Sequence, residues 1–375
     1  MRRSVSLCLL LCLSSGCSLF NRVRVDPLAT SYQKPSHVAA YVAVSDGDEP
    51  IIDLQAHSFK IYENEQLLSP DDTQQVLLPQ EVATYHHTVL LVDVSGASPG
   101  DDKLARAAAS FVETLRVTQA ISVFAFDGNP GLRLVAEVSK SSDTGPVDLR
   151  ALTRLGSTDT SRNLNGALLG GLKELAARLS AQPKVVKVGT LVVFTRGADL
   201  AGRVSPADLD EVLRQTTHDI VAIGVADLAG PALAEIGKNG VSKAADEDGL
   251  GVAFENAALR ARALYNRHYL IAYCSPARGG IRHLVVEVQF RDKEGDDKAA
   301  SFSEDFDASG FGPGCHADAM PHFTPQLARP ASRKATGSEP KASKAEQSDA
   351  VSPAAPPAND DDSVAPPPNK PGYSH

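Results

Sequence analysis

The sequence lacks an apolar run of transmembrane length, an excess of positive charge and the motif of a phosphate-binding loop. Its longest apolar run, Val5 to Leu13, is about nine residues, less than half of what a transmembrane helix needs. The formal net charge is −9, and residues 17–375 are two units more negative because residues 1–16 contain two arginines and no acid. This balance argues against nucleic acid as a partner. The glycines at 166, 170 and 171 lack the Lys-Ser/Thr pair of a phosphate-binding loop.

Residues 1–16 have the layout of a bacterial signal peptide. Arg2 and Arg3 precede the short apolar run, and the small residues 14–16 precede Cys17. Small residues directly before a cysteine resemble the lipobox of bacterial lipoproteins, although the third residue before the cysteine, usually Leu, is Ser14 here. The resemblance implies that acyl chains on Cys17 anchor the protein in membrane lipid, because two or more chains hold stably. Ser18, where Asp would resemble an inner-membrane retention signal, favours the outer membrane. The alternative is an ordinary signal peptide cut near Gly16.

Cysteine is scarce, and its five copies divide by position. Cys8 and Cys12 leave with the signal peptide, and Cys17 is lipidated. Cys274 and Cys315 remain in an oxidising compartment, where two cysteines predict one disulfide. A loop of that length is stabilised by about 4 kcal/mol in the chain-entropy model. A metal site at Cys315-His316 is disfavoured because no second cysteine pair accompanies it.

Two segments of the chain show no periodic pattern. Residues 17–36 are predicted to be a tether. Residues 323–375 are rich in Pro, Ala, Ser, Lys and Asp, and such a composition buries too little apolar surface to offset its chain entropy. We therefore expect a disordered tail, which either is a solvated spacer or contacts the cell wall or a partner.

The middle of the chain contains two kinds of pattern. Residues 37–83 and 266–322 include runs that alternate apolar and polar side chains, which is typical of half-buried strands. Residues 84–265 instead alternate continuous apolar runs with segments at helical spacing. This repetition predicts a mainly parallel sheet with helices on both faces and a ligand site at the carboxyl ends of its strands. Strands are expected at 88–92, 121–126, 132–138, 189–194 and 219–225, and helices at 101–117, 164–179, 231–236, 250–264 and after the capping residue Ser205.

Four ordered segments carry a family resemblance. They are "LLVDVSGA", "NLNGALLGGLKEL", "LVVFTRGADL" and "DIVAIGV". Together they resemble the von Willebrand factor A domain over roughly residues 87–265. The resemblance implies a Rossmann-like α/β fold, a role in protein binding or cell adhesion, and in many members Mg²⁺ held by Asp-x-Ser-x-Ser, a Thr and an Asp. A small hard cation of this kind requires near-octahedral oxygen ligands.

The match to that metal motif is partial. Asp93 and Ser95 fit its first two positions, but Ala97 stands in place of the second Ser. Arg162 aligns with the Thr and Arg196 with the Asp, and both cations would repel Mg²⁺. We therefore expect no resident metal or other cofactor; if a metal did bind, Asp93 and Ser95 would be its ligands.

The two arginines suggest a different arrangement. We expect Arg196 or Arg162 to pair with Asp93, so that a guanidinium takes the place of the metal. Substitute ligands at Ser98, Thr160, Ser161 or Asp199 are disfavoured, because a one-residue shift in a tight loop turns the side chain elsewhere. The expected degenerate adhesion site comprises Asp93, Ser95, Ala97, Arg162, Asn163, Arg196 and Asp199.

The strand-like flanks on both sides of the A-type segment are too short to be stable alone. They resemble the flanks of bacterial proteins with this domain, which implies one β-sandwich, formed by residues 37–83 and 266–322, with the A-type domain of residues 84–265 inserted. The competing arrangement is a C-terminal sandwich with extra edge strands before Thr84.

Enzyme signatures are weak. Ser95 follows an apolar run as a nucleophile elbow does, but Asp93 and Ala97 stand where that turn needs glycines. The histidines at 86, 87 and 218 precede their strands, at the end opposite the site. We therefore predict no enzyme but a lipid-anchored adhesion or scaffold protein of the cell envelope that binds a protein, cell-wall or surface-polymer partner. The alternatives are a hydrolase with an unrecognised site and a periplasmic assembly factor.

Overall fold

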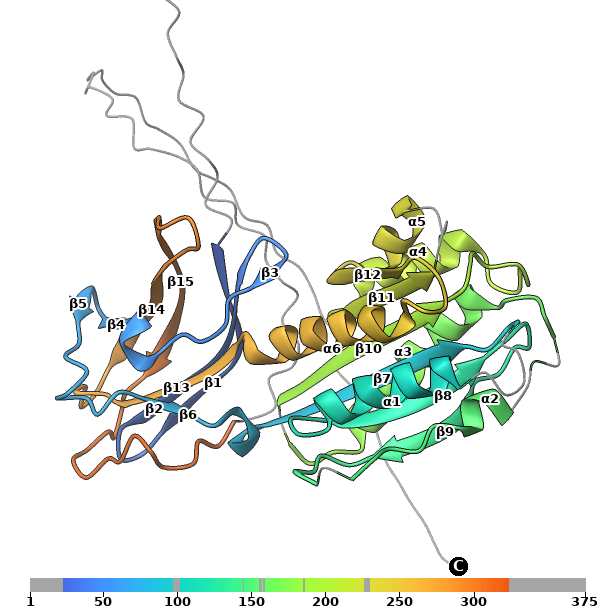
Figure 1. The fold of residues 1–375 in the computed structure, drawn as a ribbon. Helices are drawn as coiled ribbons and strands as arrows, with labels where there is room; N and C mark the ends of the chain where they lie inside the picture. The colour runs from blue at the N-terminus through green and yellow to red at the C-terminus, as the bar shows by residue number, and fades with distance from the viewer. Residues whose placement is uncertain are drawn as a thin grey trace, which may run out of the picture. The chain divides into compact units, whose positions relative to one another are not determined.

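The computed structural model describes residues 23–323 except 97–101, 144, 155–156, 158, 185 and 226–229. The expected signal peptide, the expected lipidation site Cys17 and nearly all of the expected tail lie outside the described residues. Figure 1 shows one α/β region and a second, all-β region. In the part of the chain that the structure describes, no helix is long and apolar enough to span a membrane.

The α/β region is built on a six-stranded sheet. Neighbouring strands are parallel except at one edge, where β9 runs antiparallel to β8. The central strands are continuous apolar runs whose side chains are buried on both faces, as expected of a covered parallel sheet. In sheet order the strands are β12 (Gly240–Ala244), β11 (Asp219–Val225), β10 (Val186–Thr195), β7 (Thr84–Asp93), β8 (Ala120–Phe126) and β9 (Arg133–Val138).

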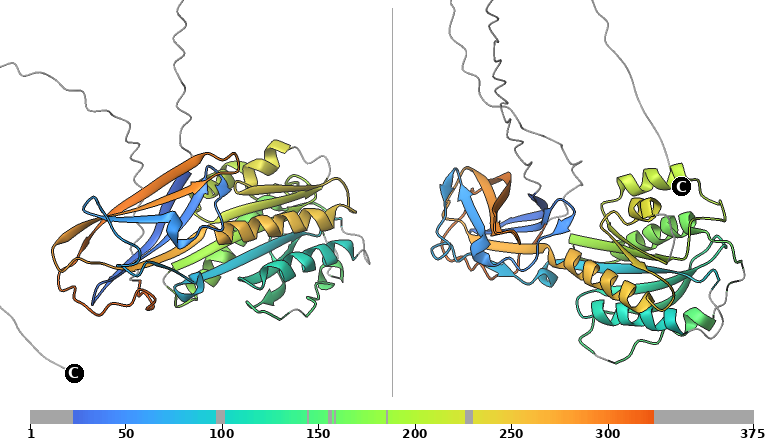
Figure 2. Two further views of the ribbon diagram at one scale, coloured as in Figure 1. Left: turned by 60° about the vertical axis from the view of Figure 1, so that its left-hand side comes forward. Right: turned by 45° about the horizontal axis from the view of Figure 1, so that its top comes forward.

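Helices cover both faces of this sheet (Figure 2). Successive residues of β7 point to opposite faces, so Leu90 and Val92 belong to one core cluster and Val89 and Leu91 to the other. Gly171 allows close packing, because a Cβ there would lie 2.8 Å from Leu91 Cδ1. One face holds α1 (Lys103–Leu115), α2 (Ala151–Arg154) and α6 (Leu250–Asn266); the other holds α3 (Leu164–Ser180), α4 (Pro206–Gln215) and α5 (Gly230–Ile236).

The all-β region consists of two antiparallel sheets around one apolar core. Both sheets combine strands from before and after the α/β region, since β2 pairs with β13 and β4 pairs with β14. The α/β region is therefore inserted into the sandwich, as the first of the two expected arrangements has it. The first sheet contains β1 (Val23–Gln33), β2 (His37–Asp46), β3 (Glu49–Pro50), β6 (Val76–Leu78) and β13 (His268–Cys274); the second contains β4 (Phe59–Glu63), β5 (Gln66–Leu67), β14 (Ile281–Arg291) and β15 (Asp297–Asp307). The short 3₁₀ helix η1 (Ala56–Ser58) precedes β4, and η2 (Gln80–Val82) leads from β6 into β7 of the parallel sheet.

The predicted tether is wrong from Val23 onward. Residues 23–33 form β1, which pairs antiparallel with β2 along its length. The tether was predicted because this segment shows no periodic pattern, but Pro27 lies on an edge strand whose register shifts between Pro27 and Ala29. At such a bulge the missing N–H of proline costs no ladder hydrogen bond. The tail boundary also shifts, because Phe323 is buried against Ala39 and Ala83.

The predicted disulfide is confirmed. Cys274 and Cys315 are bonded, with their Cα atoms 5.8 Å apart and a sequence separation of 41. The bond joins the end of β13 to the segment that follows β15. It therefore fastens residues 308–323, which contain no strand among the described residues, to the centre of the first sheet.

Candidate functional site at the strand ends

The carboxyl ends of β7, β8 and β10 lie at one edge of the parallel sheet. Asp93 is the last residue of β7 and Thr195 the last of β10. The segment that leads into α3 delivers Arg162 to the same edge, where its Nε lies 2.7 Å from Asp93 Oδ2. We call Asp93, Ser95, Arg162, Thr195 and Arg196 the strand-end site.

The carboxylate of Asp93 is the centre of the strand-end site, and its side chain is fully buried. Oδ1 accepts hydrogen bonds from the backbone N–H and the hydroxyl of Ser95, at 2.9 and 2.6 Å. Oδ2 accepts from Arg162 Nε at 2.7 Å and from the backbone N–H of Arg196 at 2.8 Å. The hydroxyl of Thr195 lies 3.3 Å from the same oxygen. An ionised carboxylate offers roughly four lone-pair sites, so these donors use all of them.

Arg162 is held on both sides of its guanidinium. Nε binds Asp93, and Nη1 donates to the carbonyl of Ala198 at 3.0 Å. The group packs on Gly197, where a Cβ would overlap Nη1, so a larger residue there would displace the guanidinium. The side chain of Arg162 is only 13% exposed. Its charge therefore lies against the Asp93 carboxylate, in the position that the sequence assigned to Arg162 or Arg196.

Arg196 contributes to the site in another way. Its backbone N–H binds Asp93, but its side chain pairs through Nη1 with Glu247 and lies 5.7 Å from the ring centroid of Phe194. Glu247 follows β12, a strand that the sequence did not predict. Of the two arginines, Arg162 is the one that contacts Asp93 through its side chain.

The other expected site residues are placed as follows. Asp199 accepts from the backbone N–H of Asn165 at 3.0 Å and of Gly202 at 2.8 Å, so it caps the amino end of α3. Asn163 is buried and donates to the carbonyl of Asn129 at 3.0 Å. Both residues shape the loops and neither is hydrogen-bonded to Asp93. Ala97 and Ser98 lie outside the described residues.

A second Asp-x-Ser turn stands beside the first and was missed. Asp159 Oδ1 accepts from the N–H and hydroxyl of Ser161 at 2.9 and 2.6 Å, as Asp93 does from Ser95. These bonds, with the nearby charge of Arg203, hold the pKa of Asp159 below its usual value. Arg203 also donates to the carbonyl of Gly128 at 2.7 Å. The signal was present in the sequence as the repeated Asp-x-Ser spacing of Asp93-Val94-Ser95 and Asp159-Thr160-Ser161.

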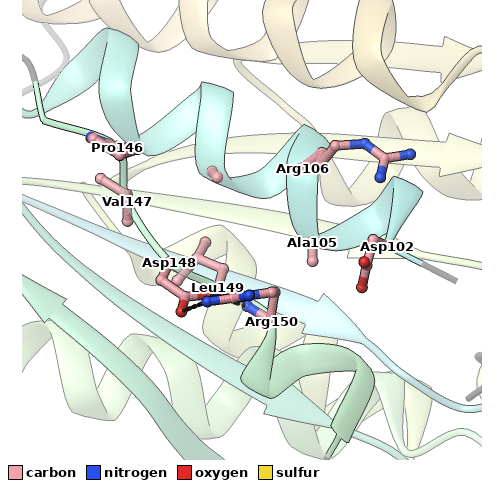
Figure 3. A pocket seen from close by; sticks show the side chains of 9 residues that line it. Asp102, Ala105, Arg106, Pro146, Val147, Asp148, Leu149 and Arg150 are labelled. Carbon is pink, nitrogen blue, oxygen red and sulfur yellow. Dashed lines mark hydrogen bonds and ion pairs between the residues drawn. The ribbon is translucent and has the colours of Figure 1, made fainter. Parts of the chain in front are cut away.

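A hollow of about 370 Å³ lies beside α1 (Figure 3). Asp102 and Arg106 line it from the α1 side, and Asp148 and Arg150 from the opposite side. Arg150 binds Asp148 with two hydrogen bonds, at 2.9 and 2.7 Å. Asp93, Arg162 and Arg196 are not among its lining residues, so the strand-end site is not the floor of this hollow.

The strand-end site does not fit a divalent cation. The lone pairs of Asp93 are taken, and the positive guanidinium of Arg162 lies against the only carboxylate of the site. Among the described residues, no group of three or more His, Cys, Asp or Glu side chains could hold a metal ion. Mg²⁺ in this position would have to displace Arg162 and face its charge.

Solved structures with similarity to this chain include von Willebrand factor A proteins. The von Willebrand factor type A protein from Catenulispora acidiphila is 13% identical over 76% of this chain and 72% of its own, with a TM-score of 0.37. The VWA domain of SpRpn10 is 9% identical over 46% of this chain and 95% of its own, with a TM-score of 0.35. The manganese-loaded Plasmodium vivax TRAP protein is 14% identical over 68% of this chain and 99% of its own, with a TM-score of 0.33. No protein-family model and no curated protein matches the sequence.

The α/β fold expected from the four sequence segments is confirmed by the sheet itself. The sheet is parallel with one antiparallel edge strand, and helices cover both of its faces. We refer to residues 84–265 as the A-type domain.

Proposed function

We propose that the A-type domain is a protein-binding module of a lipid-anchored envelope protein, and that its strand-end site works without a metal ion. The fold of the domain is that of protein-interaction domains and supports binding in preference to catalysis. The anchor on Cys17, its location in the outer membrane and the identity of the partner belong to this proposal.

One observation carries the metal-independent part of the proposal. The buried carboxylate of Asp93 is satisfied by Ser95, Arg162 and the backbone N–H of Arg196. A buried carboxylate needs a counter-charge and hydrogen bonds. Arg162 supplies both from within the chain, so the site is complete without a cation from solution.

The surface around Arg162 offers a partner both charge and apolar area. Leu200 is 68% exposed, although its backbone N–H binds the carbonyl of Arg162 at 2.8 Å. Arg203, on the same loop, is 43% exposed in its side chain. An exposed leucine beside the Arg203–Asp159 ion pair fits a partner surface with an apolar side chain at its centre, because interfaces place apolar contacts inside a polar rim.

The proposed anchor would hold the folded region near the membrane. The first strand, β1, begins at Val23, six positions after Cys17. Six residues span at most about 20 Å even when fully extended. The anchor would therefore keep the start of β1 close to the membrane surface, which suits a scaffold or adhesion protein of the envelope.

Calorimetric titration with Mg²⁺ and Mn²⁺ tests the metal-independent site. The wild-type chain should show no stoichiometric binding. A variant with Ala97→Ser, Arg162→Thr and Arg196→Asp restores the ligand types of the family motif and should bind about one ion. Stoichiometric binding of Mg²⁺ by the wild-type chain would overturn this part of the proposal.

Site-specific photo-crosslinking in the native cell tests the binding role. A photoreactive amino acid at position 200 should give an adduct with one defined protein, and Arg203→Glu should reduce it. The matched control is position 281, because Ile281 is 65% exposed but lies on β14 of the sandwich. Identical adducts from positions 200 and 281 would contradict recognition at the strand ends.

A further inference from the structure

Two adjoining hollows lie at the opposite edge of the A-type sheet, where β7 and β8 begin. Their volumes are about 220 and 270 Å³, and both are lined by Tyr85, Ala120 and Gln182. We call them together the amino-end groove. It is separate from the strand-end site, because the two ends of a parallel strand lie at opposite edges of the sheet.

A series of hydrogen bonds on the wall formed by Arg178, Ser122, His87 and Tyr85 determines which of these groups donate and which accept. Arg178 Nε donates to Ser122 Oγ at 2.6 Å, because an arginine has donors only. The buried Ser122 hydroxyl then has one acceptor among the described residues, His87 Nε2 at 2.9 Å. Burial, and then the charge of Arg178, lower the pKa of His87 to about 4, so the ring is neutral and carries one proton, on Nδ1. Nδ1 lies 3.0 Å from Tyr85 Oη and donates to it.

This series of hydrogen bonds therefore ends at the hydroxyl hydrogen of Tyr85. Tyr85 Oη already accepts from His87, so its own O–H is the donor that remains. No acceptor for it is found within the described part of the chain. Since Tyr85 lines both hollows, this O–H is available to a ligand in the groove.

Gln119 supplies a second donor. Its side chain is buried, and Oε1 accepts from the Thr88 hydroxyl at 3.0 Å. Nε2 is buried and has no hydrogen-bond partner among the described residues. A buried donor without a partner costs about 1–3 kcal/mol. Gln119 lines the larger hollow, so an acceptor atom bound there would remove that cost.

The charges of the larger hollow leave one cation in excess. Lys140 pairs with Glu81 at 2.9 Å. Lys184 also lines the hollow, but its Nζ donates only to the neutral carbonyl of Val82, at 2.6 Å, and no described acid pairs with it. Lys184 thus presents a charge that Glu81 does not balance.

The remaining walls are mixed, because Thr84, His86, Thr118 and Gln182 also line the larger hollow. Tyr265, Pro183 and Ala120 line the larger hollow together with the polar groups above. Small-molecule sites combine mostly apolar walls with a few convergent polar groups. Among the described residues, the donors of Tyr85 and Gln119 have no internal partner, Gln182 offers both a donor and an acceptor, and the unbalanced charge is positive.

We propose that the amino-end groove binds a small organic acid, with its carboxylate on Tyr85, Gln119 and Lys184 and its apolar body against Tyr265 and Pro183. A carboxylate accepts hydrogen bonds and donates none, which matches this set of donors. An amine would be repelled by the unbalanced charge of Lys184, even though Gln182 offers it an acceptor. The proposal is independent of the strand-end site.

Calorimetry of the full chain with octanoate, octanol and octylamine tests the proposal. Octanoate should bind with one-to-one stoichiometry, and the alcohol and amine should not displace it. Lys184→Gln keeps a donor for the Val82 carbonyl but removes the charge, and should weaken octanoate binding about tenfold. Tyr85→Phe keeps the ring but removes the O–H, and should weaken it about threefold.

Lys243→Gln, an exposed lysine on β12, and Tyr62→Phe, on β4 of the sandwich, are the matched controls and should leave binding unchanged. Thermal unfolding of every variant separates loss of the site from loss of the fold. No binding of octanoate, equal binding of octanol, or equal effects of Lys184→Gln and Lys243→Gln would each overturn the proposal.

Discussion

Arg162 Nε donates to Asp93 Oδ2 over 2.7 Å and joins the end of β7 to the segment before α3, 69 positions further along the chain. Asp93 is fully buried and Arg162 nearly so. The pair lies at the carboxyl ends of the parallel strands. Together with the other donors, Arg162 leaves the Asp93 carboxylate without a free lone pair. A contact of this kind has consequences for stability that can be measured without knowing the partner.

Arg162→Ala should lower the free energy of unfolding by about 3 kcal/mol, because it leaves a buried carboxylate without its counter-charge. Adding Asp93→Asn should recover part of the loss, since the charge is then removed as well. Urea unfolding measures both effects. Arg214→Ala is the control: Arg214 pairs with Glu211 on the exposed face of α4 and should cost about 0.5 kcal/mol or less. Equal losses in the Arg162 and Arg214 variants would show that the buried pair adds nothing.

Stability should fall as the pH is lowered below about 6.5. Burial lowers the pKa of His268 to about 3 and that of His87 to about 4, whereas in the unfolded chain both titrate near 6.5. The unfolded state therefore binds more protons between these values, and the stability present above pH 6.5 is lost as the pH falls toward 3. Each histidine contributes a slope of about 1.4 kcal/mol per pH unit.

Urea unfolding between pH 7.5 and pH 4 measures that slope. His268→Phe keeps an aromatic ring against Tyr41 and should flatten it. His57→Gln, at an exposed position of η1, should leave it unchanged. A slope that is the same in all three proteins would contradict burial of a neutral His268.

The strands that are continuous apolar runs could be predicted from the sequence. β7 and β10 are buried on both faces, so their composition reports their position in the sheet. The sequence was insufficient for β1, which shows no periodic pattern and contains a bulge after Pro27, and for β12, a short edge strand with alternating exposure. Edge strands have one unpaired side and one exposed face, so their sequences are less constrained.

The strand-end site shows a similar limit. The sequence placed Arg162 and Arg196 at the same edge, because each follows or precedes a predicted element. Which of them reaches Asp93 depends on the direction in which each loop turns its side chain. The side chain of Arg196 turns to Glu247 and pairs with it instead of Asp93. Glu247 follows β12, which the sequence did not predict. The local sequence pattern does not predict contacts between loops that are distant along the chain.

The disulfide should make a large contribution to stability. It closes a loop of 41 positions, for which chain entropy predicts about 4 kcal/mol. A variant with Cys274→Ser and Cys315→Ser should unfold at lower urea concentration by a corresponding amount. Dithiothreitol should destabilise the wild-type chain and leave this variant unchanged, which separates loss of the bond from loss of packing. Insensitivity of the wild type to dithiothreitol would mean that the loop is already fixed by its other contacts.

Substitution of alanine for glycine should change the free energy of unfolding in opposite directions at two helical positions. A Cβ at Gly171 of α3 would lie 2.8 Å from Leu91 Cδ1 and 2.9 Å from Leu191 Cδ1, so Gly171→Ala forces the sheet and helix apart. Such overpacking costs about 1–3 kcal/mol, more than the helical preference of alanine returns. At Gly251 of α6 a Cβ would meet nothing within 4 Å, so Gly251→Ala should stabilise by up to about 1 kcal/mol. Urea unfolding of the two variants side by side measures both signs, and stabilisation by Gly171→Ala would show that α3 does not pack as closely on β7 and β10 as described.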